Sequence, residues 1–211
     1  AIALILEHRK MAKMRSSYVE NLLNFMDEDG IVRADFQIHG TETGRLSVRD
    51  PALQTIPRGS GRGAELGKIV KDAFVARAGF KLLQGDYSQA ELRAAAALSN
   101  EPFLIDVYAN GRDLHSEVAV GMYGKEYTKE DRVRCKMFNF SYLYGGNEYS
   151  FAQDSGLDIE IAKQFVRDYD ALMPRLAEWK KEQYDKMARQ GFVHYRTGRR
   201  RRIPFISYAN Q

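Results

Sequence analysis

The pattern in this sequence that best suits a chemical task is a row of two cations and two aromatic residues at a spacing of four: Arg132, Lys136, Phe140 and Tyr144. On a helix, residues at this spacing fall along one slowly drifting stripe. Two cations in the N-terminal half, where the helix dipole is also positive, would attract an anionic group such as a triphosphate. The two rings further along could stack on a base or a sugar. The alternative, which spacing alone favours, is a solvated cationic edge beside two core aromatics.

Local signals on both sides of this stripe predict that it lies on one helix. Thr128 is followed three residues later by Asp131, which is the spacing of a capping box and predicts a helix start. Gly145 and Gly146 follow the stripe and predict the helix end. The four side chains are therefore expected to share one helix face.

A second candidate is the acid Asp86, at the end of a run typical of a β-strand, residues 80–86. Residues 88–98 then carry strong helix formers. An aspartate between a strand and a helix is well placed to hold Mg²⁺ with one carboxylate while substrate phosphates supply further ligands. Taken alone, a helix N-cap role for Asp86 is at least as good an interpretation.

The remaining elements form a mixed pattern along the chain. Residues 1–25 have apolar residues at helical spacing, residues 31–38 are strand-like, and residues 39–68 are rich in Gly, Ser, Thr and Arg. After residue 100 a helical pattern dominates to about residue 190. The turns expected within it lie at glycines: Gly111, Gly124, Gly145, Gly146 and Gly156. We therefore expect an α+β fold in which a small sheet is followed by a helical lobe.

The composition excludes several classes of protein. Of 211 residues, 44% are hydrophobic and 28% charged, which excludes collagen-like, disordered and membrane proteins and suggests one large or two small domains. Lys+Arg 32 against Asp+Glu 28 gives a formal net charge of +4, and arginines cluster near the end of the chain, at Arg196 and at residues 199–202. The single cysteine, Cys135, excludes an internal disulfide framework and favours a reducing compartment.

Two segments resemble motifs of family A DNA polymerases, the bacterial DNA polymerase I group. Residues 86–93, Asp-Tyr-Ser-Gln-Ala-Glu-Leu-Arg, resemble motif A, in which Ile usually stands in place of Ala90. Residues 132–145 resemble motif B, which has Arg, then Lys four residues on, an aromatic four further and a Tyr-Gly pair. Further matches follow the family's order and extend the resemblance over nearly the whole chain: residues 43–47, 50–57, 113–115 and 198–200.

The resemblance implies catalytic roles for four residues. Asp86 would bind both catalytic Mg²⁺ ions through its carboxylate, with help from the backbone carbonyl of Tyr87. Arg132 and Lys136 would grip the triphosphate of the incoming nucleotide, and Lys136 would donate a proton to the leaving pyrophosphate. Such a scheme agrees with phosphoryl-transfer chemistry, which needs positioning and charge neutralisation more than covalent help.

The resemblance also implies a nucleotide pocket. Phe140 would pack against the sugar and base, and Glu91 would act as a steric gate against a ribose 2′-OH. Gln89 and His115 would line the pocket. Tyr144 would lie beside the templating base and so contact both nucleotide and DNA.

Contacts with primer–template DNA are implied for two residues of the Gly-rich stretch. Arg45 and Gln54 would touch the minor-groove side or the backbone of the duplex, in a salt-dependent and sequence-tolerant way. Without the flanking motifs, Arg45 would be interpreted as a solvated loop cation and His115 as an ordinary surface histidine.

The second carboxylate of a two-metal site is missing from the sequence. The family carries it in a His-Asp-Glu motif, whereas the four histidines here are followed by other residues: Arg9, Gly40, Ser116 and Tyr195. We therefore expect a fragment of a right-hand polymerase fold that lacks the C-terminal palm strands. Its parts would be the end of the thumb (residues 1–25), a partial palm sheet with motif A (26–100), and helical fingers with motif B that return toward the palm (101–211). Two alternatives are open: the polymerase is truncated, or its gene is naturally split and a second chain completes the palm. Without the missing strands, an exposed apolar edge and face would favour aggregation.

The resemblance thus implies template-directed DNA synthesis by a DNA-directed DNA polymerase, with Mg²⁺ as cofactor, primer–template DNA and dNTPs as partners, and no association with a membrane. This fragment alone is expected to be inactive, because it needs a C-terminal segment for the second carboxylate. The expected location is the cytoplasm of a bacterium or a phage-infected host, near the nucleoid. One alternative is a catalytically incomplete module that binds primer–template or nucleotide. A third interpretation is a single-subunit RNA polymerase. Glu91 argues against it, because a side chain that excludes the ribose 2′-OH selects deoxynucleotides.

Overall fold

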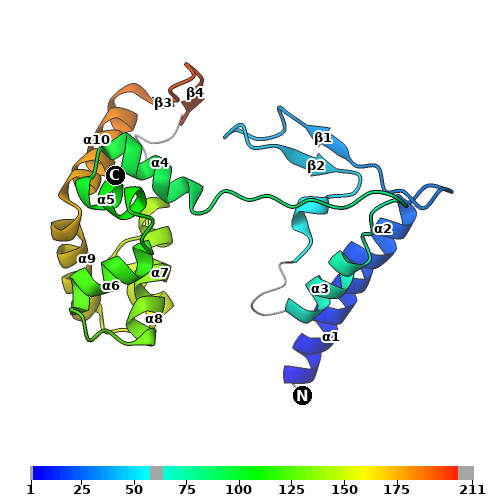
Figure 1. The fold of residues 1–211 in the computed structure, drawn as a ribbon, viewed down its shortest axis with the longest axis horizontal. Helices are drawn as coiled ribbons and strands as arrows, with labels where there is room; N and C mark the ends of the chain where they lie inside the picture. Colours follow the sequence, from blue (N-terminus) through cyan, green and yellow to red (C-terminus); the bar gives the residue numbers. More distant parts are fainter. Residues whose placement is uncertain (1, 58–63, 204–211) are drawn as a thin grey trace. The chain divides into compact units, whose positions relative to one another are not determined.

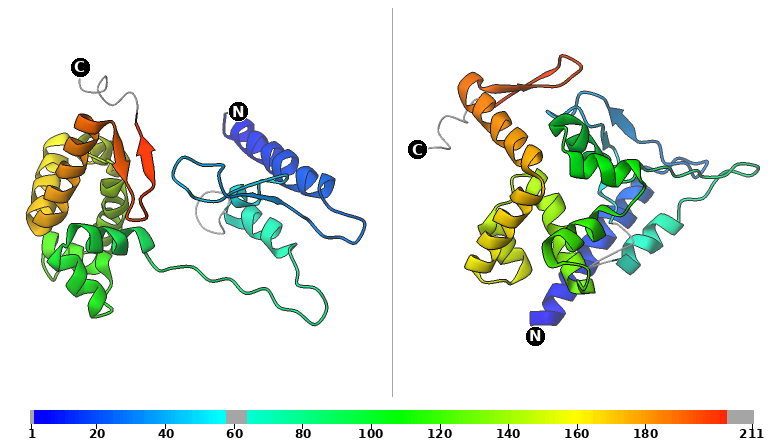
Figure 2. Two further views of the ribbon diagram at one scale, coloured as in Figure 1. Left: turned by 90° about the horizontal axis from the view of Figure 1, so that it is seen from above. Right: turned by 60° about the vertical axis from the view of Figure 1, so that its left-hand side comes forward.

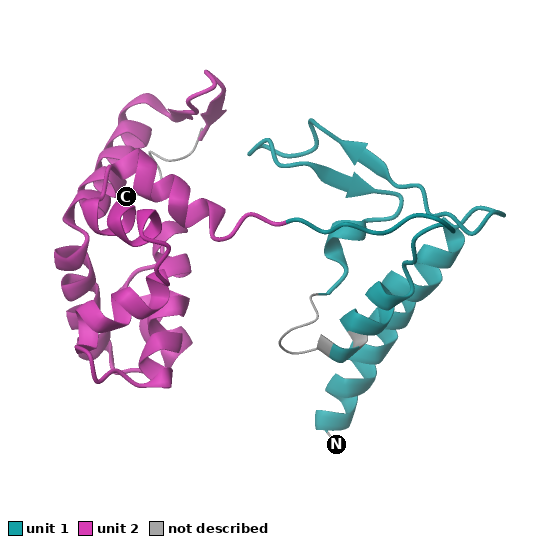
Figure 3. Cartoon of the chain, viewed as in Figure 1, with its two compact units in different colours: residues 1–85 teal, residues 86–211 magenta. Residues whose placement is uncertain are grey.

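The computed structural model describes residues 2–57 and 64–203 of the chain. The chain divides into two compact units, Ala1–Gly85 and Asp86–Gln211 (Figure 3). Within the described residues no helix combines the length and the apolar character needed to cross a membrane.

The first unit begins with a long helical segment and ends in an extended chain (Figure 1). Helix α1 (Ile2–Met14) continues through a π-helical turn (Arg15–Glu20) into α2 (Asn21–Asn24), which confirms the helix expected over residues 1–25 for the described part. The Tyr18 hydroxyl donates a hydrogen bond of 2.8 Å to the Thr55 carbonyl and so ties this segment to a 3₁₀ turn, Leu53–Thr55. Helix α3 (Ala64–Asp72) follows.

One short antiparallel hairpin lies in the first unit. Strands β1 (Asp35–Gln37) and β2 (Ser47–Arg49) pair with Phe36 opposite Val48. β1 falls inside the stretch predicted to be a strand, residues 31–38, and β2 inside the Gly-rich stretch, whose residues 58–63 lie outside the described part of the chain.

The strand predicted for residues 80–86 is wrong. This segment is extended but belongs to no sheet, because β1 and β2 pair only with each other and no other described strand is its neighbour. A strand is stabilised by the hydrogen bonds of a partner, and a suitable local sequence cannot supply them. Its apolar side chains face solvent, and that of Leu83 is 98% exposed.

The second unit is a helical lobe followed by a hairpin (Figures 1 and 2). Its helices are α4 (Ala90–Ser99), α5 (Pro102–Ala109), α6 (Leu114–Tyr123), α7 (Lys129–Leu143), α8 (Glu148–Ser155), α9 (Ile159–Leu172) and α10 (Pro174–Gln190). The helical pattern predicted after residue 100 is confirmed. Strands β3 (Phe192–His194) and β4 (Arg200–Arg202) then pair antiparallel, which the arginine-rich sequence did not suggest.

The core of this lobe is built around Phe138 of α7. Four rings have their centroids 4.8–5.5 Å from that of Phe138: Tyr142, Phe151, Phe165 and Tyr169. Cys135 lies on the same buried face, and burial raises the pKa of its thiol to about 12. With this face anchored in the core, the cationic stripe lies along an adjoining face of α7, where Phe140 still packs against the core.

A buried acid joins two helix N-termini in this lobe. Glu101, only 2% exposed, is the N-cap of α5, where its Oε1 accepts a hydrogen bond of 3.0 Å from the Phe103 amide. Its Oε2 accepts bonds of 2.9 and 3.2 Å from the amides of Arg175 and Leu176, at the start of α10. Both helix ends thereby find acceptors for otherwise unpaired N–H groups.

Candidate nucleotide-binding site

The helix that carries the cationic stripe begins and ends where its sequence predicts. In the capping box of α7, Thr128 Oγ1 accepts a bond of 3.2 Å from the Asp131 amide, and Asp131 Oδ2 accepts one of 2.9 Å from the Thr128 amide. Tyr144 is the C-cap, and Gly145 follows with φ 87°, a conformation that favours glycine. All four stripe residues are thus on this helix or at its end.

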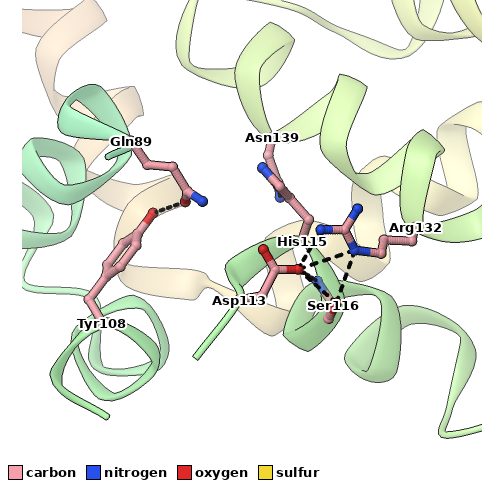
Figure 4. A network of polar contacts seen from close by, with 7 residues as sticks. All are labelled: Gln89, Tyr108, Asp113, His115, Ser116, Arg132 and Asn139. Carbon is pink, nitrogen blue, oxygen red and sulfur yellow. Dashed lines mark hydrogen bonds and ion pairs between the residues drawn. The ribbon is translucent and has the colours of Figure 1, made fainter. Parts of the chain in front are cut away.

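The two cations of the stripe differ in their surroundings. Arg132 is half-buried, and its Nη2 and Nε donate to Asp113 Oδ2 at 2.8 and 3.2 Å, while Nε also lies 3.0 Å from Ser116 Oγ (Figure 4). Lys136, one turn further, is exposed and has no ion pair among the described residues. An anion at this surface would therefore meet the Lys136 ammonium directly, and would share Arg132 with Asp113.

Asp113 fixes Arg132 because Asp113 is itself fixed at the start of α6. It is the N-cap of that helix, where its Oδ2 accepts bonds of 3.0 Å from the Ser116 amide and 2.7 Å from the Ser116 hydroxyl. Partial burial raises the pKa of Asp113, but the hydrogen bonds from Ser116 and Arg132 outweigh it, so the pKa lies below its ordinary value of 3.8.

The lowered pKa of Asp113 predicts an acid-dependent loss of stability. Because the carboxylate is favoured in the folded state, its contribution is fully present above the ordinary pKa and is lost as pH falls through the folded-state pKa. Denaturation of the wild type and of Asp113→Asn at pH 6 and pH 3 measures this contribution. We expect the variant to be less stable by up to ~1 kcal/mol at pH 6, because the pair is partly exposed, and the difference to shrink at pH 3. An equal difference at both pH values would contradict the assignment.

His115 is buried rather than a surface histidine. Its side chain is 4% exposed, and its Nδ1 lies 2.9 Å from Asn139 Nδ2 (Figure 4). Its ring centroid lies 5.7 Å from that of Phe140. Burial lowers its pKa, the charges of Arg132 and Lys136 lower it further, and Asp113 opposes them. The structure therefore brings His115 together with three members of the stripe.

Gln89 is held by a tyrosine that the sequence did not suggest. Gln89 precedes α4 with φ 53°, in the left-handed region, and its Oε1 accepts a bond of 2.9 Å from the Tyr108 hydroxyl of α5 (Figure 4). The Arg93 guanidinium lies 4.4 Å from the centroid of the Tyr108 ring, and burial raises the pKa of Tyr108 to about 12. Tyr108 thus remains a neutral donor that orients the Gln89 amide.

Replacing Tyr108 with Phe should free the Gln89 side chain while keeping the ring. We expect a loss of about 1 kcal/mol in the free energy of unfolding and a few-fold weaker binding of dNTP. Tyr149→Phe is the matched control, because Tyr149 is an exposed residue of α8. Denaturation and nucleotide titration of both variants test this, and unchanged values for Tyr108→Phe would refute the role of the hydroxyl.

Glu91 and Tyr144 are brought together from two helices. The Tyr144 hydroxyl, at the end of α7, donates a bond of 2.9 Å to Glu91 Oε1 in the first turn of α4. The Tyr144 side chain is 67% exposed. Two residues that the resemblance assigned to one pocket are therefore neighbours.

Asp86 and Tyr87 lie just before α4 and are both exposed. The N-cap of α4 is Gln89, so the alternative interpretation of Asp86 as that cap is wrong. Asp86 has no hydrogen bond or ion pair within the described residues, and these residues include no group of three or more potential metal ligands from His, Cys, Asp and Glu. A single carboxylate and a backbone carbonyl fit Mg²⁺, which takes its other ligands from water and substrate phosphates.

Arg45 and Gln54 lie in the first unit, apart from the other site residues in the sequence. Gln54 Oε1 accepts a bond of 2.6 Å from the Val48 amide of β2, which fixes the 3₁₀ turn against the hairpin. The Arg45 carbonyl accepts a bond of 2.6 Å from Thr41 Oγ1, and its side chain is exposed. Each side chain is thus carried by an internally braced loop.

A family model described as DNA polymerase family A matches residues 1–211, the whole chain. The chain belongs to this family. Family A relatives include the thermostable DNA polymerase I of Thermus filiformis, 35% identical over 210 residues, and DNA polymerase I of Lactococcus lactis subsp. lactis, 34% identical over 213 residues. The chain spans only 25% and 24% of the length of these two relatives, although 98% and 99% of the chain is covered.

A solved family A structure has the same fold. The POL domain of Pol1 from M. smegmatis, in a complex with DNA primer-template and dNTP, superposes with a TM-score of 0.84 at 32% identity. The alignment covers 96% of this chain and 35% of that one. The mostly helical architecture with small sheets is therefore that of a DNA polymerase I polymerase domain, and the predicted α+β class holds only in this helix-rich form.

Proposed function

We propose that this chain is the part of a family A DNA polymerase that binds the incoming dNTP and contributes Asp86 to template-directed DNA synthesis. The observation that carries the proposal is the exposed Lys136 ammonium, one helical turn from Arg132 and followed by the rings of Phe140 and Tyr144. The reaction is transfer of a nucleotidyl group from a dNTP to a primer 3′-OH, with release of pyrophosphate.

The basic residues of α7 would act on the phosphates. Arg132 and Lys136 would hold the triphosphate and offset the negative charge that develops on the leaving pyrophosphate. Lys136, with three donor hydrogens and no described partner, would also supply the proton that pyrophosphate takes up. Asp86 and the Tyr87 carbonyl would hold Mg²⁺, which when bound neutralises phosphate charge and favours the anionic 3′-oxygen.

The other pocket residues would select and orient the nucleoside. Phe140 would pack on the sugar and base, and Gln89 and His115 would line the pocket. Glu91, held by the Tyr144 hydroxyl, would leave no room for a ribose 2′-OH and so favour dNTPs over rNTPs. This selection separates the proposal from the RNA polymerase alternative.

The wider arrangement follows the family's polymerase domain. Residues 1–25 would be the end of the thumb, 26–100 the part of the palm with motif A, and 101–211 the fingers. Arg45, Gln54 and Tyr144 would contact primer–template DNA, which is present with dNTP in the similar M. smegmatis complex. The two relatives named above are bacterial, so the proposal places the chain in the cytoplasm with the nucleoid.

Single-nucleotide primer extension tests the proposal. The 211-residue chain is incubated with primer–template, Mg²⁺ and either dNTPs or rNTPs, alongside Asp86→Asn, which removes one charge but keeps the side-chain shape. Extension with dNTPs that is lost in Asp86→Asn supports catalysis by this chain. Binding of dNTP and duplex without extension supports the alternative of a binding module. Failure to bind dNTP would contradict both.

A further inference from the structure

A buried chain of polar side chains runs behind the candidate nucleotide pocket and joins three helices. His115 of α6, Asn139 of α7 and Tyr169 of α9 are 4%, 0% and 1% exposed. The Tyr169 hydroxyl lies 2.9 Å from Asn139 Oδ1, and Asn139 Nδ2 lies 2.9 Å from His115 Nδ1. Polar groups this deeply buried are costly unless each is paired, so their arrangement is well determined.

The hydrogen bonds assign the proton positions in this chain. The Tyr169 hydroxyl needs an acceptor, which Asn139 Oδ1 supplies. If the amide were reversed, its NH₂ group would face Tyr169, and the hydroxyl proton would have no acceptor among the described residues. With the amide so oriented, Asn139 Nδ2 donates to His115 Nδ1, which must therefore carry a lone pair. The neutral ring then bears its proton on Nε2.

The second ring nitrogen of His115, Nε2, keeps some accessible surface although the residue is only 4% exposed. Nε2 has no hydrogen-bond partner in the described part of the chain, and it is not among the enclosed side-chain atoms without one. Arg132 and Lys136 of the neighbouring helix are close enough to disfavour a positive charge on the ring, as burial does, and Asp113 alone opposes them. A neutral ring donates one hydrogen bond, and its tautomer decides from which nitrogen.

We propose that Asn139 and Tyr169 are positioning residues that hold His115 as the Nε2–H tautomer, so that its ring donates a hydrogen bond to a phosphate of the dNTP. The inference rests on the proposed function, because it takes the anion at Arg132 and Lys136 to be a nucleoside triphosphate. The opposite tautomer would present a lone pair to the phosphate and repel it. The buried relay thereby makes a neutral histidine a third phosphate ligand beside the two cations.

The tautomer can be measured without any nucleotide. In ¹⁵N-labelled chain, long-range ¹H–¹⁵N correlations of the ring identify the protonated nitrogen, and His115→Gln identifies the signals among those of the four histidines. We expect Nε2–H at pH 7, persisting to a pH below the ordinary histidine pKa of 6.5. In Tyr169→Phe the amide is free to reverse, and a population with Nδ1–H should emerge. Asn139→Asp should shift the proton to Nδ1 completely or charge the ring, because a carboxylate only accepts.

A titration with dATP and Mg²⁺ then tests the consequence. We expect roughly tenfold weaker binding in the variants with an altered tautomer, with primer–template affinity unchanged. In a His115→Gln background, whose amide has no tautomers, Tyr169→Phe should have no further effect on dATP binding. A wild-type ring protonated on Nδ1, or folded variants whose neutral ring keeps its single proton on Nε2, would overturn the inference. So would dATP binding that is unchanged despite an altered tautomer. Absence of dATP binding by the wild type would instead refute the proposed function.

Discussion

Replacing Lys136 with Ala is expected to weaken dNTP binding roughly 30-fold, and to slow nucleotide incorporation by a further ~10²-fold wherever extension is observed. The first loss, about 2 kcal/mol, is that of a hydrogen bond to a charged group. The second is the loss of a proton donor to pyrophosphate. Lys136 should matter more than Arg132 for binding, because Arg132 is already bonded to Asp113 and Ser116.

The control for this variant is Lys163→Ala. Lys163 is a cation of α9 that is paired with Glu160 at 2.7 Å, and its removal changes the net charge by the same amount. Nucleotide titration, primer extension and duplex binding are compared for both variants. If Lys136→Ala lost duplex affinity and nucleotide affinity equally, Lys136 would be a general DNA contact and not a triphosphate ligand.

The helix of the site could be predicted from sequence because its determinants are local. Thr128 and Asp131 are three residues apart and mark the beginning of α7, and Gly145 follows the last stripe residue and marks its end. Each end of the helix is therefore determined by residues that are close to it in the sequence. Helical periodicity then fixes which side chains share a face. The prediction of a strand over residues 80–86 also relied on local sequence and was wrong, because a strand needs a pairing partner that local sequence does not specify.

The partners of the site residues could not be predicted for the same reason. Tyr108 bonds to Gln89, Asn139 bonds to His115, and Tyr169 bonds to Asn139, in pairs that lie 19 to 30 residues apart in the chain. Asp113 is partly an exception, since its spacing from Ser116 is that of an N-cap. The spacing gives no sign that Arg132 would share the same carboxylate. The β3–β4 hairpin was missed because its second strand, Arg200–Arg202, has a composition untypical of strands.

Glu101→Ala is expected to lower the free energy of unfolding of the helical lobe by about 4 kcal/mol, a large part of the 5–15 kcal/mol typical of a domain. The carboxylate accepts three backbone N–H groups, from Phe103, Arg175 and Leu176, and alanine would leave all three without their acceptor. The Arg175 guanidinium does not pair with it, since that group is bonded to Glu178. The charge of Glu101 is thus balanced by the two helix N-termini whose N–H groups it accepts.

Two further variants separate this capping role from a general effect of removing an acid. Glu178→Ala deletes an exposed acid of α10 and should cost at most ~1 kcal/mol. Glu101→Gln keeps one oxygen acceptor but turns an NH₂ group toward N–H donors. Its loss of unfolding free energy, about 2 kcal/mol, should therefore lie between those of Glu101→Ala and Glu178→Ala.

Fluorescence of Trp179, the single tryptophan, follows denaturation of the lobe, because Trp179 packs against its core. If Glu101→Gln were as stable as the wild type, the hydrogen bonds of the second carboxylate oxygen would contribute little. The bridge between α5 and α10 would then not be a source of stability.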